Sequence, residues 1–433
     1  MQGHGGLLSP MHRYLSAFTR SRLGRSVVWR LKKRVNRLDG LDRKVISFNP
    51  ATSPCGDVLI SHLLKPFLTK PEQSILHSHT RYWEAAQIVK TFVDRGYCVD
   101  VINYNNREFI PRKNYAFFVD SRFNFDRISP LLGSNCVKIL HGETAHILFH
   151  NAAESKRLLA LYERRGAVVA ARRWERANKA TEHADHITVF GNQFTLSTYR
   201  YTKKPIYPLS ISTTILLPWP DGKDFNAARQ RFLWFGSGGM VHKGLDLVLE
   251  AFAGMPEYHL TVCGPVQREK DFEQVFYKEL YATPNIHTIG WIDTQSSAFR
   301  EIIANCVGLV YPSCSEGQSG AVVECLHAGL IPIISYESGV DTHDFGVLLK
   351  TCDIDEIRDA VRMVATSSAR QVEKMARSAW EYARFHHTRE QFAAKYCDVI
   401  RQIIALPGGP VGRRSSSVEV SDESTGATIR PTS

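Results

Sequence analysis

Hydrophobic and polar positions in the first half of the chain alternate between two periods. Short apolar runs rich in β-branched residues, such as DVLISHLL at 57–64, predict strands, and CVDVINY, YAFFVD, CVKIL and HITVFG repeat this pattern. After the first run, HTRYWEAAQIVKTFVDRG places Ala85, Ile88 and Phe92 on one face, which predicts a helix that stops at Gly96. This alternation of strand and helix indicates a parallel sheet covered by helices on both faces.

The same alternation restarts at Arg231. The runs RFLWFG, YHLTVCG, IHTIGWI, CVGLVYPS and GLIPIIS predict strands, and HKGLDLVLEAFAGM and AVVECLHAG predict helices between them. A proline-rich stretch, KKPIYPLSISTTILLPWPDG, separates the two alternating regions and marks a domain boundary. The predicted fold class is therefore α/β with two Rossmann-like domains.

Segments outside these regions complete the predicted organisation. An Arg-rich stretch from Glu154 to Glu182 predicts a long helix, and Thr388 with Gln391 has the capping-box spacing that starts the last helix. The composition beyond Pro407 is typical of disorder. The predicted order is a basic N-terminal extension at 1–44, a first Rossmann-like domain at 45–205, a linker at 206–228, a second Rossmann-like domain at 229–380, a C-terminal helix at 381–405 and a disordered tail at 406–433.

Composition narrows the class of protein. Hydrophobic residues make up 43% of the 433 positions, which is ordinary for soluble globular chains. No apolar run is long enough to span a bilayer, and the N-terminus lacks the apolar core and cleavage site of a secretory signal. Nine cysteines without a CxxC pair fit buried thiols in a reducing compartment better than disulfides or a zinc site. We therefore expect a cytoplasmic protein.

The positive charge, +11 overall, is concentrated near the N-terminus. Between Met11 and Lys44 there are eleven Lys or Arg residues against two Asp, a net charge of +9. One interpretation is a peripheral contact of residues 11–44 with the anionic inner face of a membrane. The alternatives are a solvated basic arm or a helix packed on the core. No nucleic-acid-binding motif accompanies the charge, so we expect no nucleic-acid partner.

Two carboxylates bracket a glycine-containing loop in SEGQSGAVVE, from Ser315 to Glu324. The loop follows a predicted strand and precedes a helix, which in open α/β sheets is the ligand-binding edge. Its glycines and the helix N-terminus favour a phosphate, whereas two flanking acids suit the hydroxyl groups of a sugar or ribose. An acid in a first helical turn would explain Glu324 without any ligand, but it would not explain Glu316.

A second glycine loop, WFGSGGMVHKG, also lies between a predicted strand and a helix. A dinucleotide fingerprint would need glycine where Val241 stands, and a P-loop would need Lys and then Ser or Thr after Gly244, where Leu245 and Asp246 stand. With both motifs excluded, what remains is a glycine loop with one positioned cation, Lys243. Taken alone it would be an exposed lysine at a helix start, but beside the other loop a phosphate-binding role is favoured.

Together these loops resemble the C-terminal donor domain of GT-B glycosyltransferases. GSGGMVHKG, then EGQSGAVVE, then GLIPIIS resembles glycosyltransferase family 4, which is marked by a Glu-x7-Glu motif, here Glu316 and Glu324. The resemblance is strongest over 229–350 and weaker over 45–205, which would be the acceptor domain. It implies two Rossmann-like domains facing a cleft, with the final helix crossing back to the first domain.

The resemblance also implies roles for individual residues. Glu316 would contact donor-sugar hydroxyls, Glu324 would bind the ribose diol, and Lys243 would neutralise the leaving pyrophosphate. Where the family commonly has arginine after the first-loop glycine, this chain has Ser237, and His242 is a candidate for part of that charge. The implied donor-binding positions are completed by Gly236, Gly238 and Gly239 in the first loop, by the amides of Gly317, Gln318, Ser319 and Gly320 for the β-phosphate, and by Gly264, Trp291 and Ile292 for the base.

The first half offers weaker candidates. His141 lies where the family places a histidine near the donor sugar, although a buried or loop histidine with a satisfied hydrogen bond is an alternative. His77, His79 and Arg81 are candidate acceptor contacts. His146 and His150 have zinc-pair spacing but lack the HExxH pattern, and in DID at 353–355 a helix N-cap explains Asp355, so we expect no metal.

The resulting hypothesis is a metal-independent, retaining glycosyltransferase without a resident cofactor. It would move a sugar from a nucleotide-diphosphate sugar to a glycan or lipid-linked acceptor, in cell-surface polysaccharide or lipopolysaccharide synthesis. The proposed catalytic residues are Glu316, His141 and Lys243. The alternatives are a nucleotide-sugar epimerase or phosphorylase on the same fold, and a non-catalytic, membrane-associated protein that binds nucleotide sugars.

Overall fold

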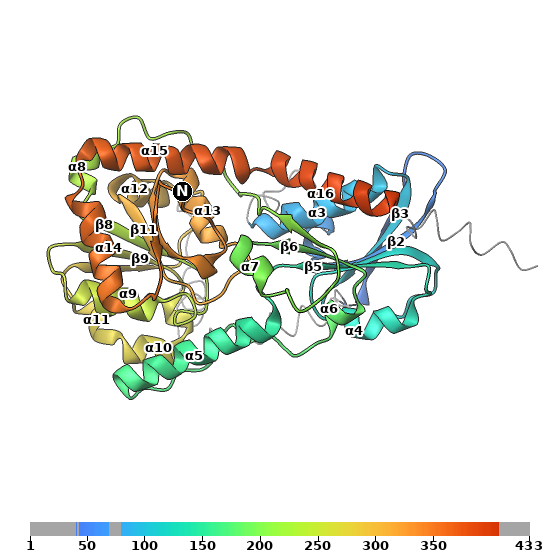
Figure 1. The fold of residues 1–433 in the computed structure, drawn as a ribbon, viewed down its shortest axis with the longest axis horizontal. Coiled ribbons are helices and arrows are strands. Elements are labelled where there is room, and N and C mark those ends of the chain that lie inside the picture. The colour runs from blue at the N-terminus through green and yellow to red at the C-terminus, as the bar shows by residue number, and fades with distance from the viewer. Residues whose placement is uncertain (1–39, 41–42, 69–78, 407–433) are drawn as a thin grey trace, which may run out of the picture.

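The computed structural model describes residues 40, 43–68 and 79–406. Two α/β domains lie side by side, each built around its own sheet (Figure 1). The predicted basic extension lies almost entirely outside the described residues, as does the predicted tail beyond Leu406. Among the described residues, no helix combines the length and the apolar character needed to cross a membrane.

In the described part of the chain, seven strands form the first sheet in the order β1-β3-β2-β4-β5-β6-β7. All neighbours are parallel except β1, which runs antiparallel to β3 at the edge. The strands are β1 Val45–Phe48, β2 Gly56–His62, β3 Tyr97–Asn103, β4 Tyr115–Asp120, β5 Val137–Gly142, β6 His186–Phe190 and β7 Ile206–Leu209. The helices of this domain are α3 Thr80–Val93, α4 Phe125–Ile128, α5 Ile147–Arg165, α6 Ala180–His183 and α7 Gln193–Ser197.

The second sheet is parallel throughout and contains six strands among the described residues, in the order β10-β9-β8-β11-β12-β13. Its strands are β8 Arg231–Phe235, β9 His259–Cys263, β10 Ile286–Gly290, β11 Gly308–Tyr311, β12 Ile331–Ser335 and β13 Val347–Leu349. Its helices are α8 Phe225–Ala228, α9 Leu245–Ala253, α10 Lys270–Val275, α11 Tyr277–Tyr281, α12 Ser297–Asn305, α13 Gly320–His327, α14 Ile354–Thr366 and α15 Ala369–His386.

This strand order is that of the Rossmann fold, and it creates a switch point between β8 and β11. From β8 the chain continues to one side of the sheet, and from β11 it continues to the other. The loops that follow these two strands therefore diverge and leave a crevice between them. They are the two glycine-containing loops of the sequence, so the topology itself brings them together. The predicted fold class, two Rossmann-like α/β domains, is confirmed.

Two segment boundaries differ from the prediction. Strand β7 lies at 206–209, inside the predicted linker, and pairs with β6 of the first sheet. The Arg-rich stretch is not one helix, because α5 ends at Arg165 and Gly166 takes a left-handed conformation with φ 61°. The chain then turns back along α5, where the Glu154 carboxylate accepts hydrogen bonds from the amides of Arg172 and Arg173 at 2.8 and 2.9 Å.

The last two helices connect the domains. Helix α15 packs on α13 of the second domain, and α16, Arg389–Ala405, packs on α3 of the first (Figure 1). The ring of Trp83 on α3 meets that of Phe392 on α16 with centroids 5.9 Å apart. Thr388 caps α16 by accepting a hydrogen bond from the Gln391 amide at 3.2 Å, as the capping-box spacing predicts. The chain therefore crosses the domain boundary between α15 and α16, and the final helix packs on the first domain.

Helix α5 makes a second connection, on the opposite side of the molecule (Figure 1). Arg164 pairs with the fully buried Asp246 of α9 at 2.6 Å, and Arg165 pairs with Glu279 of α11 at 2.6 Å. Arg172, on the returning segment, pairs with Asp271 of α10 at 2.5 Å. Because the first domain carries the arginines and the second the carboxylates, these ion pairs fix how the two domains face each other.

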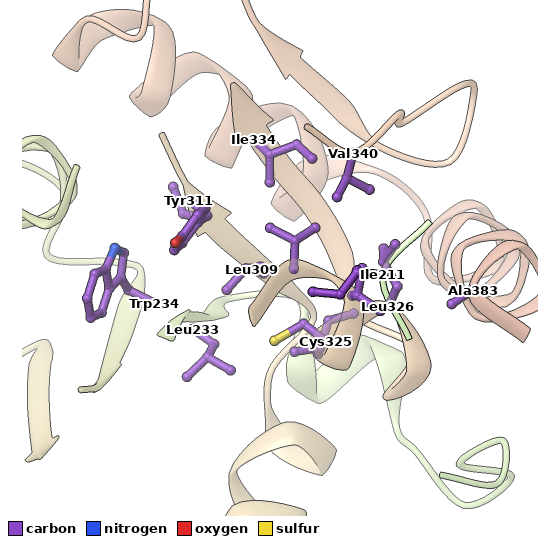
Figure 2. Close-up of a cluster of buried hydrophobic side chains, with 14 of the residues drawn as sticks. Ile211, Leu233, Trp234, Leu309, Tyr311, Cys325, Leu326, Ile334, Val340 and Ala383 are labelled. Atoms are coloured by element: carbon purple, nitrogen blue, oxygen red, sulfur yellow. The ribbon is translucent and has the colours of Figure 1, made fainter. Parts of the chain in front are cut away.

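A continuous apolar core supports the crevice from below. Figure 2 shows Trp234 of β8 beside Tyr311 of β11, and Leu326 of α13 next to Ile211 of the interdomain segment on the other side of Leu309. The rings of Trp234 and Tyr311 are stacked with centroids 6.4 Å apart, and the Trp234 indole donates a hydrogen bond to the Lys243 carbonyl at 3.3 Å. Close packing of this kind leaves little freedom to the loops that begin directly above it.

Candidate functional site

A cleft of about 410 Å³ lies between the two domains, above the switch point of the second sheet. Both glycine loops contribute to one wall, and loops of the first domain form the other. Of the residues predicted from sequence, the cleft is lined by His79, Arg81, Gly236, Ser237, Gly238, Lys243, Gly264, Trp291, Ile292, Glu316, Gln318, Ser319, Gly320 and Glu324.

The centre of the cleft is a buried charge cluster around Glu316. The Lys243 ammonium contacts the Glu316 carboxylate directly and donates a hydrogen bond to the Tyr311 hydroxyl at 2.8 Å. The Tyr311 hydroxyl in turn donates to Glu316 Oε1 at 2.9 Å, and the hydroxyl of Ser313 lies 3.4 Å from the same oxygen. A positive and a negative group are therefore held side by side in a site shielded from water.

The electrostatics of this cluster follow from its packing. Although burial opposes ionisation, the cations of Lys243 and Arg173 hold the pKa of Glu316 well below its usual range. Burial lowers the pKa of Lys243, and the Glu316 carboxylate opposes that effect. Because the two groups are in direct contact, each stabilises the charged form of the other. The site thus offers both a fixed anion and a fixed cation.

Glu324 lies on the first turns of α13, at another point of the same cleft. Burial raises the pKa of its carboxyl to about 7, and the Thr214 hydroxyl, which donates a hydrogen bond at 2.6 Å, opposes the shift. No basic side chain of the described residues forms an ion pair with it. A half-buried carboxylate that lacks a cation is well suited to accept hydrogen bonds from neutral hydroxyl groups.

Only some of the residues in the loop before α13 that were predicted to bind the donor face the cleft with a free amide. Gly317 does not line the cleft but packs against the first domain, where an added Cβ would lie 2.3 Å from the Glu143 carbonyl. The Ser319 amide already donates to the Ser338 carbonyl at 2.9 Å. The amides of Gly320 and Ala321, which begin α13 at the cleft, have no intrahelical acceptor and are available to an anion.

The first glycine loop has an internal anion that the sequence analysis missed. The carboxylate of Glu269 accepts hydrogen bonds from the amides of Gly239 and Met240, the latter at 3.1 Å. Gly239 has φ +94°, a left-handed conformation that favours glycine. Because these amides already serve Glu269, the loop has fewer donors to offer a ligand than its glycine content suggests.

His242 does not supply the missing arginine charge. It is buried outside the cleft, where its Nε2 hydrogen-bonds the Ser315 carbonyl and its Nδ1 lies 3.5 Å from the Cys314 thiol. Burial lowers the pKa of His242 to about 3, so the ring is neutral at physiological pH. The ring of His150 lies 4.8 Å away. These two histidines join the domains rather than bind an anion.

One end of the cleft is apolar and partly open. Gly264, Trp291 and Ile292 line it together with Pro265 and Arg268. Trp291 is 66% exposed, which is unusual for so large an aromatic residue. Gly264 is required for space, because an added Cβ would lie 2.7 Å from the Trp234 ring and 2.8 Å from the Gly236 carbonyl. A flat aromatic ring has both room and a stacking surface at this end.

The first-domain wall is built around Glu143 rather than His141. Arg81 makes a two-pronged contact with the Glu143 carboxylate, both distances being 2.6 Å, and Arg122 approaches it at 3.2 Å. His141 is fully buried behind this wall, bonded through Nδ1 to the Thr188 hydroxyl at 2.9 Å, and burial lowers its pKa to about 4. The structure does not bring His141 into the cleft.

Two other first-domain predictions have separate outcomes. His79 lines the cleft and caps α3 by accepting a hydrogen bond from the Arg81 amide at 3.2 Å. His77 lies outside the described residues. Glu143 could have been found from sequence, because it follows β5 and therefore lies at the same carboxyl edge as the other site residues.

The residues considered as metal ligands have other contacts. His146 caps α5 and bonds the Tyr201 hydroxyl at 3.0 Å, while His150 bonds the Ser315 hydroxyl at 3.0 Å. The N-cap of α14 is Asp353, not Asp355 as predicted, and its side chain accepts the Glu356 amide at 2.8 Å. Over residues 43–68 and 79–406, no three His, Cys, Asp or Glu side chains gather in a way that could hold a metal ion.

Comparison with known proteins identifies what the second domain is similar to. Residues 229–367 match the family model described as Glycosyl transferases group 1. This range begins just before β8, ends just after α14 and contains both cleft loops. No curated protein sequence matched the chain. The second domain thus has the sequence features of a group 1 glycosyltransferase domain.

Several solved structures share the two-domain arrangement. Sucrose-phosphate synthase from Thermosynechococcus elongatus has a TM-score of 0.58 at 14% identity, over 82% of this chain and 100% of that one. HepE from Anabaena in complex with UDP and glucose has a TM-score of 0.50 at 11% identity, over 81% and 100%. A trehalose-6-phosphate synthase has 0.53 at 10% identity, over 80% and 99%. The fold is therefore that of GT-B glycosyltransferases.

Proposed function

We propose that the protein is a glycosyltransferase that moves a sugar from a nucleotide-diphosphate sugar to a hydroxyl group of an acceptor. The observation that carries this proposal is the placement of Glu316, Lys243 and Glu324 on one wall of a single interdomain cleft. The match of residues 229–367 to a glycosyltransferase family model supports it, as does the GT-B fold.

The residues along the cleft suit the successive parts of a nucleotide-diphosphate sugar, from the base to the sugar. The exposed Trp291 and the space above Gly264 suit the base, and the cation-free carboxyl of Glu324 suits the ribose diol. Lys243 and the α13 N-terminus suit the diphosphate, whose charge they would neutralise. The carboxylate of Glu316 then lies where the sugar hydroxyls would reach.

In the proposed reaction the bond between the sugar C1 and the diphosphate oxygen breaks, and its electron pair leaves with the nucleoside diphosphate. A bond forms between C1 and the acceptor oxygen, whose proton is released. Lys243 would stabilise the leaving anion, and Glu316 the positive charge that develops on the sugar. Contact of the acceptor with both walls would limit the access of water, which would otherwise take the place of the acceptor.

We further propose that transfer proceeds with retention and needs no metal or resident cofactor. The trehalose-6-phosphate synthase of similar fold is described as a case of glycosyltransfer with retention, which supports this choice. The acceptor would meet the first-domain wall at His79, Arg81 and Glu143. We propose that the acceptor is a glycan or a lipid-linked molecule. The reaction would belong to cell-surface polysaccharide or lipopolysaccharide synthesis and would take place at the inner face of the membrane.

The test begins with thermal denaturation in the presence of UDP, GDP and ADP, comparing the wild type with Glu324→Gln. A nucleotide present at a hundred times its Kd should stabilise the fold by about 2.7 kcal/mol. We expect one nucleotide to raise Tm in the wild type and to do so less in the variant. If none of the three changes Tm, the proposed donor site is wrong.

Turnover of the corresponding nucleotide sugar separates the remaining alternatives. A glycosyltransferase releases nucleoside diphosphate in proportion to added acceptor. An epimerase converts the nucleotide sugar without any acceptor, a phosphorylase carries a pyridoxal group that absorbs near the visible range, and a binding protein binds without turnover.

A further inference from the structure

Five basic side chains among the described residues line the cleft, and they differ in what they already contact. Arg81 and Arg122 are paired with Glu143, and Lys243 is paired with Glu316. Arg268 is exposed and lies at the open end of the cleft. The guanidinium of Arg173, by contrast, has no hydrogen bond or ion pair with any described residue, and its Nε is buried.

The backbone of Arg173 is held firmly although it lies outside any helix or strand. Its amide donates to the Glu154 carboxylate at 2.9 Å, and its carbonyl hydrogen-bonds His150 Nε2 at 2.8 Å. The neighbouring Glu175 is fixed by a pair of hydrogen bonds with Asn151, at 2.8 and 2.9 Å. The segment is therefore fastened to α5 on both sides of Arg173, which fixes the origin of a long cationic side chain.

The side chain crosses from this segment of the first domain to the glycine loop of the second. A Cβ added to Gly239 would lie 2.6 Å from Cγ and 2.9 Å from Cδ of Arg173, so the arginine stem rests directly on that glycine. The charge of Arg173 acts on the Lys243 and Glu316 pair, helping to lower the pKa of both groups. The guanidinium thus lies close to the cation proposed to receive the diphosphate.

The second domain itself is short of positive charge at this point. Ser237 stands where the resemblance leads one to expect arginine, and His242 is neutral and buried away from the cleft. Glu269 occupies two amides of the glycine loop. Of the two basic side chains that the second domain contributes to the cleft, Lys243 is paired with Glu316 and Arg268 lies at the open end, away from the proposed diphosphate position.

We infer that Arg173 of the first domain supplies the second cation for the donor diphosphate, in place of an arginine in the glycine loop of the second domain. This inference rests on the proposed function. A guanidinium is planar, always charged and able to form two parallel hydrogen bonds with phosphate oxygens. Donor binding then requires both domains at once, which links occupation of the site to the α5 contact between them.

The test compares Arg173→Ala with Arg176→Ala in titrations with UDP and with uridine. Arg176 is a matched control, because it is an exposed arginine of the same segment and does not line the cleft. For Arg173→Ala we expect the Kd of UDP to rise about 10- to 100-fold, the usual range for losing hydrogen bonds to a charged group, with the Kd of uridine unchanged. Arg173→Lys should fall between that variant and the wild type, and Arg176→Ala should match the wild type.

Each outcome is decisive. If wild type binds none of UDP, GDP and ADP, the proposed function is wrong and this inference falls with it. If the preferred diphosphate binds Arg173→Ala as tightly as the wild type, only the inference is overturned. An equal loss of affinity for the nucleoside and the diphosphate would also overturn it, because that result reports a distorted cleft. Addition of Ser237→Arg to Arg173→Ala should restore part of the diphosphate affinity.

Discussion

The two walls of the cleft are built in different ways. On the second-domain wall, Glu316 and Glu324 come from one loop and its helix, and Lys243 comes from the loop after the neighbouring strand. On the first-domain wall, Arg81 comes from the first turn of α3, and Arg122, Glu143 and Arg173 come from three separate connections. The second-domain wall is a local sequence pattern placed by the strand order of one sheet, whereas the first-domain wall depends on how distant segments pack.

This difference has consequences for charge. The second-domain wall holds its ion pair within a single domain. The first-domain wall neutralises Arg81 and Arg122 with one shared carboxylate and leaves Arg173 to face across the cleft. We therefore expect substitutions in the second-domain wall to affect chemistry most, and those in the first-domain wall to affect the acceptor and the diphosphate separately.

The largest effect is expected for Lys243→Met on the second-domain wall. The substitution removes the cation from the leaving group and leaves Glu316 buried without its direct partner. Transfer should fall by about 100- to 1,000-fold, and the free energy of unfolding by about 3 kcal/mol. Turnover with saturating donor and urea denaturation measure the two quantities.

The double variant Lys243→Met/Glu316→Gln is the control for that prediction. Because it removes both charges, the free energy of unfolding should recover most of the loss, while transfer should stay low. Recovery of transfer together with stability would mean that the pair serves only the fold, and the difference between the two walls would disappear.

A smaller and more selective effect is expected for Glu143→Gln on the first-domain wall. The change leaves the charges of Arg81 and Arg122 without their shared carboxylate. The kcat/KM for the acceptor should fall by about tenfold, whereas the Kd of the nucleotide should not change. Glu175→Gln, which affects Arg122 alone, is the matched control and should be milder. Weaker nucleotide binding in Glu143→Gln would contradict the division of labour between the walls.

The smallest expected effect is the pH dependence of donor binding, which is measured on the wild-type protein. Burial raises the pKa of Glu324 to about 7, and ribose hydroxyls would bind its ionised form. As pH falls through 7 the carboxyl takes up a proton and loses the negative charge that strengthens hydrogen bonds from the ribose hydroxyls, so donor affinity should fall about tenfold from pH 8 to pH 6. A nucleotide sugar is the appropriate probe, because it lacks the terminal phosphate that itself titrates near pH 6.

Glu324→Gln should remove most of this pH dependence, since its amide does not titrate. If the variant keeps the full slope, another group controls donor binding, and Glu324 is an ordinary buried acid at the start of α13. The slope therefore distinguishes a ligand-binding carboxyl from a structural one.

Local periodicity was sufficient to predict most elements and the fold class. Strands such as β4 and β8 are short apolar runs, and helices such as α3 carry one apolar face, so each signal lies within a few residues. The long helix from Glu154 to Glu182 was predicted wrongly because arginine-rich sequence has good helix propensity on both sides of Gly166. The turn is held by hydrogen bonds that the amides of Arg172 and Arg173 donate to the Glu154 carboxylate.

The sequence by itself was enough to predict that the two glycine loops, with Lys243, Glu316 and Glu324, belong to one site. Each loop directly follows a strand, and the Rossmann strand order brings the loops after β8 and β11 to one crevice. Only the tertiary structure decided that His141 and His242 are buried and uncharged, that Glu269 occupies the glycine-loop amides, and that Arg173 crosses to the second domain. These outcomes depend on desolvation and on contacts between residues far apart in the chain, and neither quantity is encoded in local spacing.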